Sequence, residues 1–216
     1  MFDLLWKATA ETLYMISIAS FFTLVLGLPL GILVTVTRKG HILEKKWTNQ
    51  ILSYFVNLGR SLPFIILMIF MMPFTRFLVG TSIGTKAAIV PLVIAAFPFF
   101  ARVVESALLE VDEGVIEAAH AFGASEFQII FKVLLPEALP SLILGGTITM
   151  INLLGYSAMA GAVGGGGIGD LAIRYGYHRF RADVMLATVI LLVLFVQVIQ
   201  STGNLIARQL LKNRRK

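Results

Sequence analysis

The side chains that most often carry out enzyme chemistry are scarce in this 216-residue sequence. There is no cysteine, which excludes a disulfide framework, a thiolate nucleophile and a cysteine-ligated metal. The three histidines, His41, His120 and His178, are far apart in the sequence and form no ligand cluster. No set of nucleophile, histidine and acid is visible either. We therefore expect this chain to bind no cofactor and no metal itself.

A glycine-rich run, Gly164–Gly167 with Gly169, has the composition of a phosphate-binding loop. A P-loop also needs a Lys-Ser/Thr pair where its helix begins, and Ile168 and Asp170 follow here instead. We interpret the run as a flexible external turn. Without a P-loop, the chain cannot hydrolyse ATP in the P-loop manner.

A polar stripe is the strongest candidate for a functional surface. At about 100° per residue, its members fall within roughly one quarter of a helix circumference. Polar groups inside a membrane face protein or water, while small residues let helices approach closely. The stripe therefore predicts either a translocation path or a packing interface, and the two merge if the path lies on a two-fold axis. It carries no charge, which suits a small zwitterion or a neutral solute, and it consists of Gly145, Thr149, Asn152, Tyr156 and Met159.

The composition indicates that these residues lie in a membrane protein. Hydrophobic residues make up 57% of the chain and charged residues only 14%, and the mean hydropathy is +0.87. Soluble domains carry about 25% charged residues, and disordered chains need low hydrophobicity. Stretches of roughly 20 apolar residues are long enough to cross a bilayer as helices. We predict one all-α transmembrane domain over residues 1–216 with five spans, at 13–36, 51–74, 87–104, 140–162 and 184–206; Pro91 and Pro98 interrupt the third.

The basic residues predict the orientation of these spans. Five spans place the termini on opposite sides, and twelve of the 18 Lys and Arg residues fall on one side. The side richer in positive charge is normally cytoplasmic. We therefore expect the N-terminus outside and the C-terminus in the cytoplasm. The basic tail Lys212–Lys216 then acts as an anchor on anionic lipid rather than as a nucleic-acid arm.

One connection, residues 105–139 on the predicted cytoplasmic side, is long and polar. It carries seven of the twelve acidic residues. Asp112 and Glu113 suit the first turn of a helix, which Gly123 would end, and a second helix would finish near Pro136. Such a helix–glycine–helix element has apolar side chains left over. It either docks on a protein partner or packs on the spans.

Two further features of the spans each have two interpretations. Arg60 lies one turn before Pro63, near the predicted cytoplasmic end of span two, and either snorkels to the interface or faces a partner or an inner vestibule. Gly27 and Gly31 form a GxxxG pair that either marks helix packing or is incidental to a kink at Pro29.

The long connection resembles the EAA loop of ABC importer permeases, whose pattern is E-A-A-x3-G-x9-I-x-L-P. The one departure, Val133 in place of Ile, is conservative. Further blocks from span one to the start of span five resemble the methionine ABC importer permease family. The matching residues are Glu117-Ala118-Ala119, Gly123, Val133 and Leu135-Pro136 for the loop, and Arg60–Leu67, Pro73–Arg76, Val79–Gly84, Val133–Pro140, Gly155–Met159 and Tyr175–Tyr177 for the family.

The resemblance implies a type I ABC importer permease of the bacterial cytoplasmic membrane. The permease would be a homodimer for L-methionine, with D-methionine and derivatives as further candidates. Two separate ATPase subunits holding ATP-Mg would dock on the coupling residues, and an external lipoprotein would deliver the substrate. The implied coupling residues are Glu117, Ala118, Ala119 and Gly123, and the path or gate residues are Thr149, Asn152, Tyr156, Ser157 and Met159.

Other functions stay open at this point. One alternative is a permease of the same architecture for another amino acid or small solute. A second, from a different class, is an intramembrane enzyme or a non-transporting scaffold. The partners that we expect are protein subunits and membrane lipid, and no nucleic acid.

Overall fold

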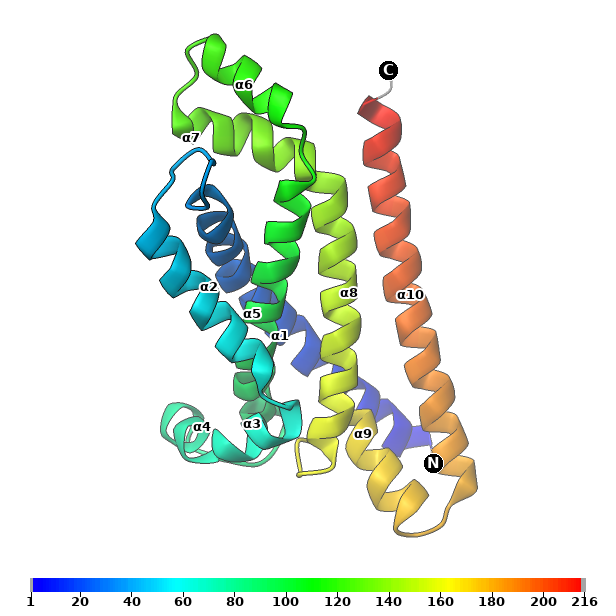
Figure 1. Cartoon of the computed structure of the whole chain (residues 1–216). Helices are drawn as coiled ribbons and strands as arrows, with labels where there is room; N and C mark the ends of the chain where they lie inside the picture. Colours follow the sequence, from blue (N-terminus) through cyan, green and yellow to red (C-terminus); the bar gives the residue numbers. More distant parts are fainter. Residues whose placement is uncertain (1, 215–216) are drawn as a thin grey trace.

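The computed structural model describes residues 2–214, which are helical throughout with no β-strand. The two termini lie at opposite ends of the helical bundle (Figure 1), as an odd number of membrane crossings requires. The C-terminal end of α10 lies at the same end of the bundle as α6, which we call the α6 end. Arg215 and Lys216 of the predicted basic tail lie outside the described residues. The elements are α1 (Phe2–Val36), α2 (Lys46–Ser61), α3 (Phe64–Phe70), α4 (Met72–Val79), α5 (Thr85–Leu109), α6 (Glu113–Ala121), α7 (Glu126–Gln128), the π-helical turn η1 (Ile129–Leu134), α8 (Leu135–Gly161), α9 (Gly167–Leu171), the π-helical turn η2 (Ala172–Tyr177) and α10 (Ala182–Arg214).

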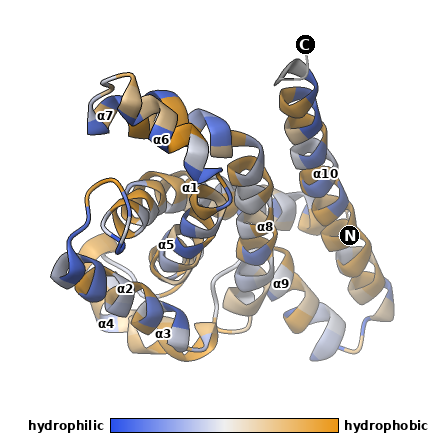
Figure 2. Cartoon of the chain, turned by 45° about the horizontal axis from the view of Figure 1, so that its top comes forward, coloured by the Kyte–Doolittle hydropathy of each residue, from blue (hydrophilic) through white to orange (hydrophobic). Residues whose placement is uncertain are grey.

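Four helical segments are long and apolar enough to cross a membrane, and the pair α2 and α3 makes a fifth if it is counted as one span. Figure 2 shows long hydrophobic stretches along these helices and hydrophilic residues in the connection between α1 and α2. The all-α membrane fold predicted from the sequence is confirmed. The segments are Phe2–Val36, Thr85–Leu109, Glu126–Gly161 and Ala182–Lys212.

The second predicted span, residues 51–74, is wrong as a single helix. The axis turns by 98° between α2 and α3, and α3 and α4 then lie across the end of the bundle opposite α6 (Figure 1). The break comes at Leu62, whose ψ of 128° is extended, because the ring of Pro63 disfavours a helical conformation in the residue before it. The sequence contained Pro63, but the direction of the turn depends on packing against other helices.

The third predicted span, residues 87–104, differs from the prediction because Pro91 and Pro98 do not interrupt it. Both prolines are buried inside the continuous 25-residue helix α5. This helix lies at the centre of the bundle and packs on α1, α2, α3, α4 and α8. The packing of neighbouring helices compensates for the backbone hydrogen bonds that the prolines cannot make.

The connection between the third and fourth spans is shorter than the predicted range, residues 105–139. Its first five residues belong to α5, and its second helix does not end at Pro136 but runs on through η1 into α8. Figure 1 shows that the chain changes direction where this segment becomes α8. The π-helical turn η1 directly precedes that bend. The separate connecting element is therefore α6 with the turn into α7.

The two glycines of the GxxxG pair bring α1 into close contact with α5. A Cβ atom at Gly27 would lie 2.9 Å from the carbonyl oxygen of Phe97, and one at Gly31 would lie 2.5 Å from that of Ala101. Pro29 lies inside the continuous helix α1. The packing interpretation of this pair is therefore the one that the structure supports.

Replacing Gly31 by leucine should destabilise the protein strongly, because the new side chain meets backbone and the buried Val104. Overpacking of this kind typically costs 1–3 kcal/mol. We expect a lower thermal unfolding midpoint and less folded protein in size-exclusion chromatography of the detergent-solubilised permease. The control is Leu33→Ala, two residues further along α1, where the side chain is exposed. Equal behaviour of the two variants would contradict the packing role of Gly31.

Candidate functional site

Helix α6 begins and ends with well-formed caps. At its start, the Asp112 carboxylate accepts a hydrogen bond of 2.8 Å from the backbone N–H of Gly114. At its end, the N–H of Gly123 donates to the carbonyl of His120, and the N–H of Ala124 donates to that of Ala119. These two bonds form a Schellman motif, which needs a left-handed residue, and Gly123 has a φ of +77°. The predicted ends of the first helix are thus confirmed.

The turn after α6 is fixed on its other side by a capping box. The Ser125 hydroxyl accepts a hydrogen bond from the N–H of Gln128, and the Ser125 N–H donates 2.9 Å to the side chain of Gln128. Only Phe122, Gly123 and Ala124 separate α6 from this box. The element α6–α7, which we call the coupling hairpin, is therefore held rigidly by local hydrogen bonds at both sides of its turn.

The coupling hairpin has one face on the bundle and one face free. Ile116 of α6 and Val111, which precedes the helix, pack against the buried cluster at the α6 end. Glu117, Ala118 and Gly123 are exposed, and Ala119 is half-buried. Apolar rings are exposed here as well: Phe122 is 92% exposed, and the ring centroids of Phe127 and of Phe131 in the adjoining η1, both exposed, lie 4.3 Å apart. The hairpin therefore combines packing on the spans with a surface that no part of residues 2–214 covers.

A cavity of about 250 Å³ separates the coupling hairpin from the connection between α1 and α2. It brings together two histidines that are far apart in the sequence, His41 and His120, with Glu113 and Glu117 from α6. Burial lowers the pKa of His41, and nearby Arg38 lowers it further, while Glu113 opposes the change. The buried Nδ1 of His41 has no hydrogen-bond partner among the described residues. Among these residues no group of three or more His, Asp or Glu side chains has the arrangement to hold a metal.

Because burial lowers the pKa of His41, acid should destabilise this end of the molecule. The unfolded chain takes up a proton near the ordinary pKa of 6.5, whereas the folded chain takes it up only at lower pH. Stability contributed by neutral His41 is therefore present above pH 6.5 and is lost as the pH falls toward the folded pKa. We expect the thermal midpoint of the wild type to fall more between pH 7.5 and 5.5 than that of His41→Asn. Parallel pH curves would contradict this.

The predicted path stripe on α8 is divided between buried and exposed positions. Gly145 and Thr149 are buried, and the Thr149 hydroxyl donates 2.8 Å to the Gly145 carbonyl. Asn152 is half-buried, whereas Met159 is 48% exposed. Buried Ser157 donates to the Leu154 carbonyl. The exposed face of α8 is rotated slightly from the prediction and runs through Leu144, Ile148, Gly155 and Met159.

Tyr156 connects α8 to the broken second span. Its ring stacks on that of Phe64 with 4.8 Å between the centroids and an interplanar angle of 8°. Phe64 is 7% exposed and lies in the first turn of α3, directly after the 98° break. The stack therefore joins α3 to α8 at the end of the bundle away from α6. Periodicity could place Tyr156 on a face but could not supply its partner.

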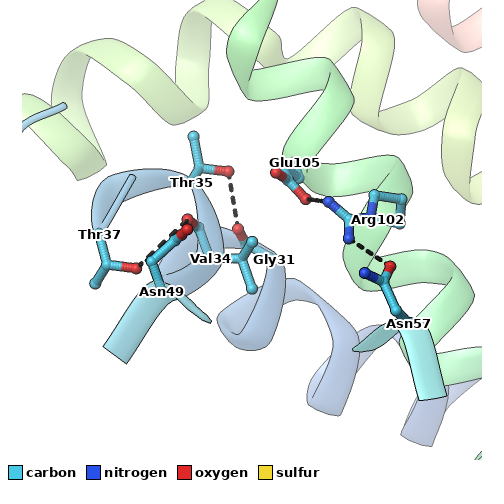
Figure 3. Close-up of polar contacts among 8 residues, drawn as sticks. All are labelled: Gly31, Val34, Thr35, Thr37, Asn49, Asn57, Arg102 and Glu105. Carbon is cyan, nitrogen blue, oxygen red and sulfur yellow. Dashed lines mark hydrogen bonds and ion pairs between the residues drawn. The ribbon is translucent and has the colours of Figure 1, made fainter. Parts of the chain in front are cut away.

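A cleft of about 500 Å³ opens between α2, α5 and α8 on the α6 side of that stack. Its charged residues are Arg60, Arg102 and Glu110. Figure 3 shows that Arg102 reaches Glu105 on its own helix and Asn57 on α2; the Asn57 contact is 2.7 Å. The sequence singles out Arg60 but indicates no role for Arg102, because only the fold brings α2 beside α5.

The glycine run after α8 is not the flexible turn that we expected. The N–H of Gly167 donates 2.9 Å to the Glu11 carboxylate, and the N–H of Ile168 donates 2.8 Å to the Thr12 hydroxyl. Gly167 and Ile168 are buried. The run is a packed junction between α1 and the start of α9. The partners Glu11 and Thr12 are 156 residues away in sequence, so local composition could not indicate them.

Residues 6–216 match the family described as the binding-protein-dependent transport system inner membrane component. The chain belongs to this family. Its members are permeases, and the chain is therefore a multi-pass inner-membrane permease of an ABC transporter, as the EAA-like pattern predicted.

Two relatives of this chain are permeases for methionine. The chain is 54% identical to the probable D-methionine transport system permease protein MetI of Vibrio cholerae, over 96% of this chain and 92% of the relative. It is 50% identical to the methionine import system permease protein MetP of Bacillus subtilis, over 94% of this chain and 91% of the relative. The resemblance to methionine permeases is thus confirmed.

Solved structures agree with this assignment. The chain is similar to a chain of the MetNI methionine ABC transporter described in inward-facing conformations, with a TM-score of 0.95, 52% identity and coverage of 97% of both chains. A chain of an amino acid ABC transporter shares the fold alone, with a TM-score of 0.79 and 17% identity.

Proposed function

We propose that this chain is the permease subunit of a bacterial ATP-driven importer for methionine, with both enantiomers and close derivatives as candidate substrates. The observation that carries the proposal is the exposed, rigidly capped coupling hairpin with the Glu117-Ala118-Ala119 and Gly123 pattern. The choice of methionine as the substrate is supported by the methionine permeases of Vibrio cholerae and Bacillus subtilis, each matched over nine-tenths of its length.

Coupling to ATP follows from the shape of the hairpin. A separate ATPase subunit docks on its free face, where Ala118 lets the partner approach closely and Phe122 supplies a large apolar contact. Because caps and packing on the bundle hold the hairpin rigid, a displacement by the ATPase is transmitted to α5 and α8 rather than absorbed by the turn. The ATPase holds ATP-Mg and carries out the hydrolysis. This chain supplies the path and no catalytic residue.

The path lies between two copies of the chain. Five helices are too few to enclose an aqueous channel, and α8 leaves Leu144, Ile148 and Met159 uncovered along one face. A two-fold dimer covers this face and places Tyr156 and Met159 near its axis. The uneven distribution of Lys and Arg assigns the two sides: the α6 end and the C-terminus lie in the cytoplasm, and the N-terminus lies outside. An external methionine-binding lipoprotein delivers the substrate to the outer end.

Transport by the purified complex tests this function. We expect proteoliposomes that contain the permease and its ATPase to accumulate radiolabelled methionine when ATP and the binding lipoprotein are supplied. Accumulation of another amino acid but not methionine would favour a permease of different specificity. Failure of any ATPase to co-purify would favour a scaffold or an intramembrane enzyme.

A further inference from the structure

The cleft between α2, α5 and α8 contains a positive charge that no described carboxylate neutralises. Arg60 lies in the last turn of α2 and is exposed into the cleft. Its guanidinium lies 5.9 Å from the centre of the Phe99 ring, and no carboxylate of residues 2–214 is within ion-pair distance. Charged side chains inside membrane helices are costly, and they usually mark a substrate pathway or a buried partner.

Snorkelling toward the α6 end does not explain Arg60. Helix α2 begins at Lys46 at the α6 end of the bundle, and Arg60 comes 14 residues later. At 1.5 Å per residue, this distance is about 20 Å along the helix, farther than an arginine side chain can reach. With the α6 end in the cytoplasm, as proposed, Arg60 lies deeper in its span than we predicted from the sequence. The vestibule interpretation is the one that fits its position.

Arg102, the second arginine of the cleft, has a structural role and serves as a comparison for Arg60. Arg102 pairs with Glu105 and donates to the Asn57 side chain, which joins α5 to α2 (Figure 3). Its side chain is 27% exposed, and that of Glu105 is 10% exposed. Its charge is compensated within the chain. Arg60 lacks such partners, which leaves its fork of N–H groups free for an incoming anion.

The rest of the cleft suits an amino acid with an apolar side chain. Phe99, Val103, Leu144 and Ile148 supply apolar walls on two helices. Ser141 and Glu110, which share a hydrogen bond of 2.8 Å, stand at the α6 end of the cleft. The cleft therefore offers one uncompensated cation beside apolar surface, and its volume of about 500 Å³ exceeds what a single amino acid needs.

We propose that Arg60 binds the α-carboxylate of the transported amino acid on the cytoplasmic side of the Phe64–Tyr156 stack. The side chain of the amino acid then lies against Phe99, Val103 and Ile148. This inference rests on the proposed import function and adds a binding site on the inner half of the path. The carboxylate forms charge-assisted hydrogen bonds with the guanidinium. Arg102 keeps its own partners, Glu105 and Asn57, and takes no part in binding the carboxylate.

The test compares ligands with and without a carboxylate on the intact complex. The permease–ATPase complex in nanodiscs, without the binding lipoprotein, is incubated with radiolabelled methionine, and unlabelled methionine or methioninol competes. Methioninol carries an alcohol in place of the carboxylate. The variants are Arg60→Gln, which removes the charge, and Arg60→Lys, which keeps it. Arg208→Gln, at an exposed arginine of α10 that does not line the cleft, is the matched control.

We expect methionine to compete at least about tenfold better than methioninol in the wild type and in Arg208→Gln. Arg60→Gln should lose this preference, and Arg60→Lys should keep part of it. An unchanged preference in Arg60→Gln, or no saturable binding to the wild type, would overturn the proposal. If uptake assays show that the substrate is a different amino acid, the same comparison with that amino acid and its alcohol tests Arg60 independently of the methionine assignment.

Discussion

Replacing Gly123 by proline should abolish ATP-driven uptake while the permease still inserts in the membrane. Gly123 has a φ of +77°, which the proline ring cannot adopt, and its N–H donates 2.9 Å to the His120 carbonyl. The substitution therefore removes one bond of the Schellman motif and forces the turn to open. Because Phe122 precedes this turn directly, its ring and the exposed face of α6 lose their fixed relation to Phe127.

The measurement is co-purification of the ATPase with tagged permease, followed by uptake in proteoliposomes. We expect Gly123→Pro to lose most of the ATPase or to lower uptake by at least about tenfold. Gly80→Pro is the matched control, because Gly80 has a φ of +81° and its N–H also donates 2.9 Å to a helix carbonyl, that of Arg76. Gly80 ends α4, at the opposite end of the bundle. If both variants lose the ATPase or uptake, or if neither variant loses either of them, the coupling role of the α6–α7 turn is refuted.

The features that the sequence predicted correctly depend on neighbours along the chain. Apolar length identified the membrane helices, and Asp112 and Gly123 identified the ends of α6, because caps are formed within a few residues. The EAA-like pattern identified the family for the same reason: its residues are spaced along one short segment. The family and the all-α fold are confirmed, whereas the roles of the coupling and path residues stay predictions.

The features that the sequence could not show depend on helices that meet only in the folded chain. We predicted one continuous span over residues 51–74, because the packing of α3 against α5 and α8, which sets the 98° turn, is not visible in the sequence. Pro91 and Pro98 appeared to interrupt a helix that its neighbours keep continuous. The glycine run after α8 appeared flexible because Glu11 and Thr12, which bind its N–H groups, lie at the other end of the sequence.

Tyr156→Ala is the second substitution for which we expect a large effect. The variant removes the ring that stacks on Phe64 and leaves the buried face of Phe64 without its partner. Aromatic pairs contribute about 0.5–1.5 kcal/mol beyond the area that they bury. The lost contact joins α3, after the break in the second span, to α8, so α3 is freed to move away from α8 at the end of the bundle opposite α6.

We expect Tyr156→Ala to lower ATP-driven methionine uptake by at least about tenfold and to permit slow methionine flux in vesicles without ATP. Tyr156→Phe keeps the stacked ring and should transport like the wild type, since the described contact of Tyr156 is made by its ring. If both variants transport normally and neither leaks, Tyr156 only fills space between α3 and α8. If Tyr156→Phe fails as well, the hydroxyl rather than the stack controls the path. Only loss with alanine and retention with phenylalanine fits a gate that closes by contact between rings.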